Sequence, residues 1–142
     1  MAGYSGTPIP KKLGIRPGFR VYLSNEPPDL HVRLRAAMTE CELVTELGNP
    51  LDFAMIFALS RTELGRLLRQ AADCLVPTGM VWAAWPKKTS GVLTDLDEHQ
   101  VREIGLRVGL VDVKVCAITD LWSGLKFVRR LTDRDPLPRG IG

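Results

Sequence analysis

The stretch from Leu51 to Lys88 has a pattern of apolar and polar residues that predicts a strand, a helix and a second strand. Two runs within it, LDFAMIFAL and MVWAAW, are almost wholly apolar, as in parallel strands covered on both faces. Between them apolar residues recur at helical spacing, and Ser60 and Glu63 have the spacing of a capping box. Pro77 and Gly79 predict the helix end. The stretch therefore predicts a helix over 61–75 between parallel strands over 52–59 and 80–85.

The rest of the chain continues this alternation. Further strands are predicted near 19–23, 41–47, 111–118 and 125–131, with one helix that begins near Asp29 and another that runs from about Asp97 to Gly109. The last two strands should be antiparallel, because the link between them is too short for a crossover. This order predicts a three-layer, Rossmann-like α/β fold: a mostly parallel sheet with helices on both faces and an antiparallel C-terminal edge hairpin.

Composition places the chain among ordinary globular proteins. Its 142 residues, 45% hydrophobic and 25% charged, are enough for one domain with a buried core. We expect an N-terminal arm over 1–18, a single α/β domain over 19–131 and a flexible tail over 132–142. Three separated cysteines argue against a disulfide framework, and no apolar run resembles a signal peptide or a membrane span. These features predict a cytoplasmic protein with no membrane partner.

Ligands of such sheets bind outside the carboxyl ends of the parallel strands. Candidate ligand-binding residues at this edge are Asn25, Glu46, Ser60, Trp85, Lys87, Lys88, Thr89, Ser90 and Gly91. The loop over 85–91 is the strongest candidate, since two lysines, two hydroxyls and a glycine suit an anionic small molecule or an acidic protein partner. The alternative is a surface loop whose lysines are merely solvated.

Other chemistry finds little support. Nucleophile motifs are absent, and His31 and His99 have no cysteine or carboxylate at ligand spacing, so we predict no catalytic residue and no metal site. The net charge of +3 is mild, which disfavours nucleic acid as a partner; a contact through Arg16, Arg20 and the two lysines is the weaker alternative. Trp82 alternates with core residues and should pack. Trp122 either contacts a ligand or folds over the sheet edge.

Two resemblances follow from particular segments. LDFAMIF, LVPTGMVWA and VGLVDVKVCAITDLWSGLKFV resemble the later half of a class I methyltransferase. GYSGTP, KKLGIRPG, VTEL, LDF, the WPKK-x-SG loop, GLVDVKVCA and WSGLKFV resemble a bacterial family of unknown function, numbered three thousand and fifty-two among such domains. Together they imply a reduced methyltransferase-like domain, and the second resemblance carries no assigned reaction.

The departures from the methyltransferase pattern determine the functional prediction. Methyltransferases of this class carry an acidic residue and a G-x-G run after the first strand, whereas this chain has LSNEPPDL, in which Pro27 and Pro28 remove two amide donors. The resemblance places Glu46 at the acidic position that reaches the ribose hydroxyls. The segment before the central unit is too short for the usual extra helix and strand. We therefore predict a non-catalytic ligand- or partner-binding module with no cofactor. The alternative is a divergent S-adenosylmethionine-dependent methyltransferase, or another enzyme that uses the same crevice.

Overall fold

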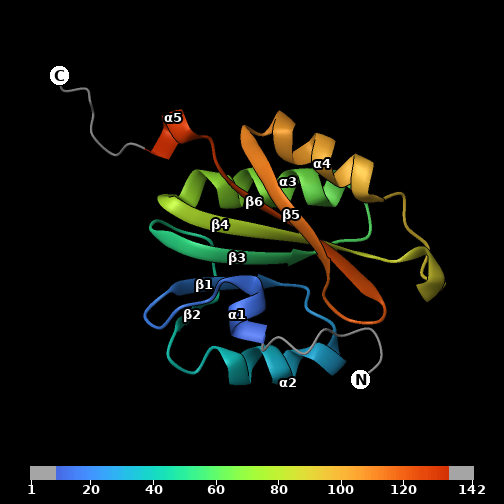
Figure 1. Ribbon diagram of the computed structural model, residues 1–142, viewed down its shortest axis with the longest axis horizontal. Coiled ribbons are helices and arrows are strands. Elements are labelled where there is room, and N and C mark those ends of the chain that lie inside the picture. Colours follow the sequence, from blue (N-terminus) through green and yellow to red (C-terminus); the bar gives the residue numbers. More distant parts are fainter. Residues whose placement is uncertain (1–8, 135–142) are drawn as a thin grey trace.

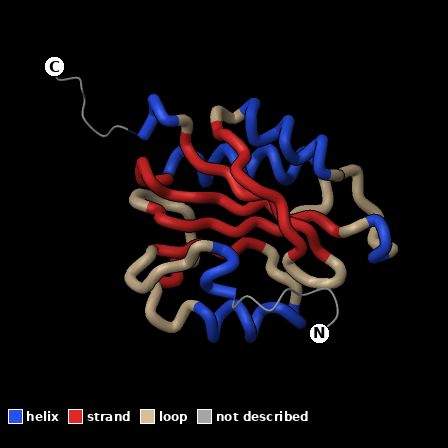
Figure 2. Tube along the Cα trace, in the orientation of Figure 1, coloured by secondary structure: helices blue, strands red, loops and turns tan. Residues whose placement is uncertain are grey.

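A six-stranded sheet forms the middle layer of the structure, a computed structural model that describes residues 9–134. The strands lie in the order β2-β1-β3-β4-β6-β5. Their bounds are Arg20–Ser24 (β1), Glu42–Val44 (β2), Leu51–Phe57 (β3), Leu75–Pro86 (β4), Leu110–Ala117 (β5) and Trp122–Arg129 (β6). Helices α3 (Arg61–Cys74) and α4 (Glu98–Arg107) cover one face of the sheet, and α1 (Ile9–Leu13) and α2 (Pro28–Ala37) cover the other (Figure 1). Figure 2 shows the same three layers as red strands between blue helices.

The predicted fold class is confirmed. β1, β2, β3 and β4 are parallel to one another, and β6 is antiparallel to both β4 and β5. The helix predicted over 61–75 is α3, and the strands predicted over 52–59 and 80–85 pair in parallel as β3 and β4. The C-terminal hairpin thus forms the antiparallel edge that the short link predicts.

Several boundaries differ from the prediction. The sequence placed a turn at Pro77 and Gly79, yet β4 begins at Leu75, directly after α3. The pairing between β3 and β4 is irregular there, which is where a sheet tolerates proline. α2 begins at Pro28, one residue before the predicted Asp29, because the fixed φ of proline suits the first helical position. β2 is shorter than the predicted 41–47 and covers 42–44 alone.

Alternate residues of β3 face two different cores. Phe53, Met55 and Phe57 pack on the side of α1 and α2, whereas Ala54 and Ile56 pack on the side of α3 and α4. Successive side chains of a strand point to opposite faces, and both faces are covered by helices. This arrangement explains why the LDFAMIF run has no polar alternation.

Part of the N-terminal segment is fixed to the sheet. The indole N–H of the fully buried Trp82 donates to the Leu13 carbonyl oxygen at 2.9 Å, and the side chains of Leu13 and Ile15 are buried. Trp82 is therefore a core residue, as predicted. Residues 1–8 of the predicted arm and 135–142 of the predicted tail lie outside the described residues, and 131–134 form the short helix α5 (Leu131–Arg134). Among the described helices, none has the length and apolar character needed to cross a membrane.

Candidate ligand-binding crevice

A crevice of about 370 Å³ opens at the carboxyl ends of β1 and β3. Its walls come from the turn after β1, the end of β3, the start of α3, the loop after β4 and the start of β6. The lining residues are mostly apolar: Asn25, Glu26, Pro27, Pro28, Phe57, Leu59, Glu63, Val92 and Trp122. Its place in the fold is the one predicted for a ligand.

Trp122 forms one wall of the crevice by packing on Phe57. The two rings meet edge to face, with centroids 5.1 Å apart and planes at 82°. β6 runs antiparallel to β4 and pairs Trp122 with Pro86, so its first residue lies where β4 ends. The Thr119 hydroxyl oxygen accepts from the backbone N–H groups of Leu121 and Trp122, which fixes the turn. Trp122 therefore packs on Phe57 across the carboxyl end of β4, an interior strand, and lines the crevice.

The turn after β1 stands where the resemblance to class I methyltransferases implies a glycine run. Asn25 has φ of 61°, a left-handed conformation that asparagine tolerates. Its side-chain amide donates to the Phe57 carbonyl oxygen at 3.3 Å and to Glu63 Oε2 at 3.2 Å. Pro27 is the N-cap of α2 and its carbonyl oxygen accepts from Leu30, while Pro28 has no N–H to offer. The start of α2 thus presents few amide donors to an anion.

Side chains of the protein already satisfy backbone N–H groups and balance the positive charge at the start of α3. The Ser60 hydroxyl oxygen accepts from the Glu63 N–H at 3.1 Å, so half of the predicted capping box forms. The Arg61 N–H donates to Asp95 Oδ1 at 2.8 Å. Two carboxylates, Glu63 and Asp95, therefore lie at the positive end of the helix dipole. They disfavour a negatively charged ligand at this point.

A third carboxylate lies on the crevice wall. Glu26 has a side chain that is 11% exposed, and its Oε2 lies 3.0 Å from His31 Nδ1 and 4.0 Å from an Arg35 guanidinium nitrogen. His31 is thus paired with a carboxylate five positions earlier, although the sequence predicted no carboxylate partner for it. Within residues 9–134, no group of three His, Cys, Asp or Glu side chains comes together to hold a metal ion.

The loop over 85–91, called here the lysine loop, borders a second hollow, which shares Val92 with the crevice. Lys88 and Gly91 line a hollow of about 490 Å³ together with residues of the following segment, including Asp95 and Asp97. The segment Lys88–Ser90 is a 3₁₀ turn, and Gly91 closes it with φ of 78°, which glycine adopts without strain. The Lys87 N–H donates to the Leu121 carbonyl oxygen at 2.8 Å, which ties the loop to the β5–β6 turn.

The structure does not gather the predicted site residues into one hollow. Asn25 lines the crevice, and Ser60 caps the neighbouring helix. Trp85 is 6% exposed and belongs to the core under α3 and α4, so the exposed loop begins after it. Glu46 is exposed beyond the end of β2, and Thr89 and Ser90 lie on the lysine loop, where the Ser90 hydroxyl accepts from the Val92 N–H.

The four basic residues considered for nucleic acid do not form one face. Arg20 begins β1, whereas Lys87 and Lys88 follow the end of β4. Because β1, β3 and β4 are parallel, Arg20 lies at the amino ends of the strands, and Lys87 and Lys88 lie at the carboxyl ends. Arg20 is in addition paired with Glu42 at 2.8 Å.

Sequence reasoning missed most of the crevice wall. Phe57 and Leu59 fall in the strand predicted over 52–59, and Val92 follows the predicted loop over 85–91, so none of them is a predicted site residue. Two tryptophans, Trp85 and Trp122, are predicted as contacts, and of these Trp122 lines the crevice. The strand-end position of Phe57 was a usable signal, but its pairing with Trp122 depends on the placement of β6 beside β4.

The three cysteines offer no activated nucleophile. Burial raises the pKa of the Cys41, Cys74 and Cys116 thiols above its ordinary value. A raised pKa keeps a thiol protonated near neutral pH, and the thiolate is the reactive form. These side chains therefore act as small packing residues.

Comparisons with known proteins identify the fold. No known family profile matches the chain, and no characterised protein matches it in sequence, so the resemblance to the numbered bacterial family stays a prediction. A SAM-dependent methyltransferase from Aquifex aeolicus is similar in structure, with a TM-score of 0.59 at 13% identity over 84% of this chain and 86% of that one. Magnesium protoporphyrin IX methyltransferase from Synechocystis, with bound SAM, gives 0.54 at 11% identity over 80% of this chain and 71% of that one. The mitomycin 7-O-methyltransferase MmcR gives 0.53 at 12% identity over 78% of this chain, which spans about half, 49%, of that protein. At these identities the likeness concerns the fold alone, and the chain has the fold of SAM-dependent methyltransferases.

Proposed function

We propose that this chain is a non-catalytic methyltransferase-like domain that binds a ligand in the carboxyl-end crevice. The observation that carries the proposal is the turn after β1. Asn25 holds this turn closed against Phe57 and Glu63, and Pro27 and Pro28 offer no N–H. A glycine run would let the backbone approach a cofactor closely. This turn has no glycine, and the two prolines fix its backbone angles.

The crevice suits a neutral ligand with an apolar or aromatic face. Phe57, Leu59, Val92 and Trp122 supply apolar walls, and ring faces stack well on such walls. The carboxylates of Glu26 and Glu63 repel an anion. An anionic small molecule or an acidic partner is proposed for Lys87 and Lys88 on the lysine loop instead, whose hollow adjoins the crevice at Val92.

Calorimetric titration with S-adenosylmethionine and S-adenosylhomocysteine tests the non-catalytic role. We expect no saturable binding tighter than roughly 1 mM, about 4 kcal/mol of binding free energy. Thermal-shift measurements with neutral bicyclic aromatic fragments test the crevice, because a ligand of the native state raises the melting temperature. The shift should disappear in Val92→Trp, which fills the crevice, and persist in Val113→Trp, a matched change at an exposed position of β5. Equal shifts in all three proteins would contradict binding at this crevice.

A divergent methyltransferase is the second candidate, favoured by the crevice at the edge of the sheet that the fold uses for ligands. The solved neighbour from Synechocystis was determined with bound SAM. Under this hypothesis, S-adenosylmethionine would bind in the low micromolar range and Glu46→Gln would weaken it. Such a result would replace the non-catalytic proposal.

A further inference from the structure

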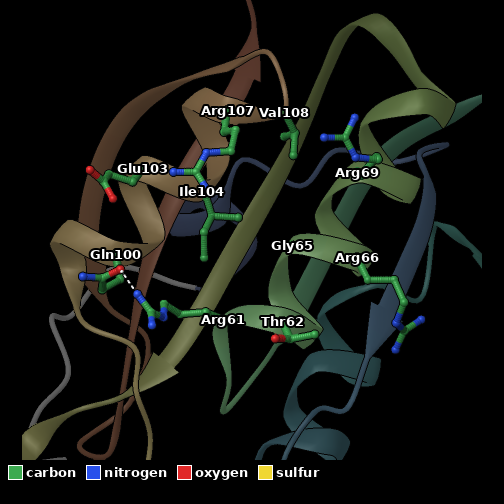
Figure 3. Close-up of a pocket in the computed structure, with 10 residues that line it drawn as sticks. All are labelled: Arg61, Thr62, Gly65, Arg66, Arg69, Gln100, Glu103, Ile104, Arg107 and Val108. Carbon is green, nitrogen blue, oxygen red and sulfur yellow. Dashed lines mark hydrogen bonds between the residues drawn. The ribbon is translucent and has the colours of Figure 1, made fainter.

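A third hollow, which the sequence did not predict, lies on the solvent side of the layer formed by α3 and α4. This groove, called here the α3–α4 groove, has a volume of about 490 Å³. α3 packs on the sheet through Leu64, Leu68 and other leucines and alanines, so its outward stripe is left to line the groove. Figure 3 shows the residues of both helices that line it, with the Arg66 guanidinium turned away from α4.

The floor of the groove is apolar and open because Gly65 has no side chain. A Cβ atom placed there would have, among the described residues, one neighbour within 4 Å, Ile104 Cγ2 at 3.9 Å. Ile104 and Val108 of the α4 side complete the floor, and Ile104 is 9% exposed. A larger residue at position 65 would therefore project into the groove instead of into the core.

The rims of the groove carry more positive than negative charge. Four arginines line it, with Glu103 as the one carboxylate among the lining residues described. Arg61 is engaged, since it lies 3.7 Å from Asp95 and donates to Gln100 at 3.0 Å. Arg66, Arg69 and Arg107 are exposed, and no described carboxylate lies within ion-pair distance of them. Arg69 lies on the α3 side and Arg107 on the α4 side (Figure 3).

We propose that the α3–α4 groove binds an acidic, amphipathic peptide segment of a partner protein. An apolar side chain of that segment would lie over Gly65 and Ile104, and its carboxylates would pair with Arg66, Arg69 and Arg107. A nucleic acid fits less well, because the described lining contains no aromatic ring on which a base can stack. The groove is separate from the crevice, so this proposal does not depend on the function proposed there.

Fluorescence anisotropy with a synthetic peptide tests the proposal. The probe is a labelled peptide of three Glu-Glu-Leu-Leu repeats, compared with Lys-Lys-Leu-Leu repeats and with labelled oligouridylate. The acidic peptide should bind the wild-type protein, and more weakly as salt increases. Arg66→Glu combined with Arg69→Glu should weaken binding by roughly tenfold or more, because the charges at the contact are reversed.

Two matched controls separate the groove from general charge and from folding. Lys11→Glu with Arg16→Glu makes the same charge change at exposed positions near α1, on the opposite face of the sheet, and should leave binding within about twofold. Gly65→Leu should abolish binding without any charge change, whereas Gly65→Ala should preserve it. Thermal unfolding verifies that each variant is folded.

Two results would overturn the proposal. One is equal binding of the acidic peptide by wild type, the double arginine variant and Gly65→Leu. The other is tighter binding of oligouridylate than of the acidic peptide, with the same loss in the arginine variant, which would identify the groove as a nucleic-acid surface.

Discussion

Replacing Gly105 with alanine should destabilise the protein, although alanine is the better helix former. Gly105 lies in α4 directly over Phe127 of β6. A Cβ atom at this position would lie 2.0 Å from Phe127 Cε1 and 2.2 Å from Cζ. The Phe127 ring is fully buried in the core, and a close-packed interior leaves it no space to move into. The helix or the strand must shift instead.

The magnitude follows from two opposing terms. Overpacking a core costs about 1–3 kcal/mol, and distances this short place Gly105→Ala at the upper end of that range. The higher helix propensity of alanine stabilises the folded protein by about 1 kcal/mol. The expected net loss is about 2 kcal/mol in the free energy of unfolding, or a fall in melting temperature on the order of 5–10 °C.

Gly65→Ala is the matched control, since it makes the same substitution in the neighbouring helix. Its Cβ would contact Ile104 at an ordinary 3.9 Å, so the gain in helix propensity should prevail by about 0.5–1 kcal/mol. Urea denaturation of both variants measures the two changes. Phe127→Leu should recover part of the loss in the Gly105→Ala background. Destabilisation of equal size at both glycines, or no recovery in the double variant, would refute the steric explanation.

Further predictions concern the lysines. Lys114 and Lys126 are directly opposite across β5 and β6, and Lys114→Glu should raise the free energy of unfolding at pH 7 by about 0.5–1 kcal/mol in urea denaturation, with Lys114→Gln intermediate. Burial, with a contribution from Lys114, lowers the pKa of Lys126 below its usual 10.5. The unfolded chain therefore binds more protons in the alkaline range, so stability should rise as the pH increases toward 10.5, and Lys126→Met should remove that rise. Replacing Lys87 and Lys88 together with alanine should change stability by no more than about 0.5 kcal/mol. The same double substitution should weaken the binding of pyrophosphate, and the loss should shrink as salt increases. Unchanged binding by calorimetry would mean that the loop is a solvated turn.

Elements with a local cause were predictable from the sequence. α3 shows its apolar stripe, its Ser60 cap and its length in consecutive residues, and β3 shows a run that both helical layers bury. The start of β4 was missed because Pro77 and Gly79 ordinarily end elements, while here an irregular pairing with β3 accommodates them. The strand predicted over 111–118 is interrupted at Val113, where a bulge against β6 leaves the side chain exposed.

Features that depend on distant contacts were not predictable from the sequence. The crevice needs Trp122 beside Phe57, 65 positions earlier in the chain, and that contact exists because β6 lies between β4 and β5. The α3 side of the groove could have been predicted more easily, because helical spacing alone places Gly65 and Arg69 on the outward stripe of α3. Which residues of α4 face them is set by the packing of both helices on the sheet.

The distribution of charge gives a physical reason for two surfaces of different chemistry. In this fold the starts of α2 and α3 lie near the carboxyl edge of the sheet, and helix starts ordinarily attract anions. Here Pro28 removes a donor and Asp29 adds a negative charge in the first turn of α2, while Glu63 and Asp95 compensate α3. Arg66, Arg69 and Arg107, which have no described carboxylate within ion-pair distance, lie instead on the outer face of the α3–α4 layer. A neutral ligand in the crevice and an acidic segment in the groove should therefore bind independently, and Val92→Trp should abolish the first without altering the second.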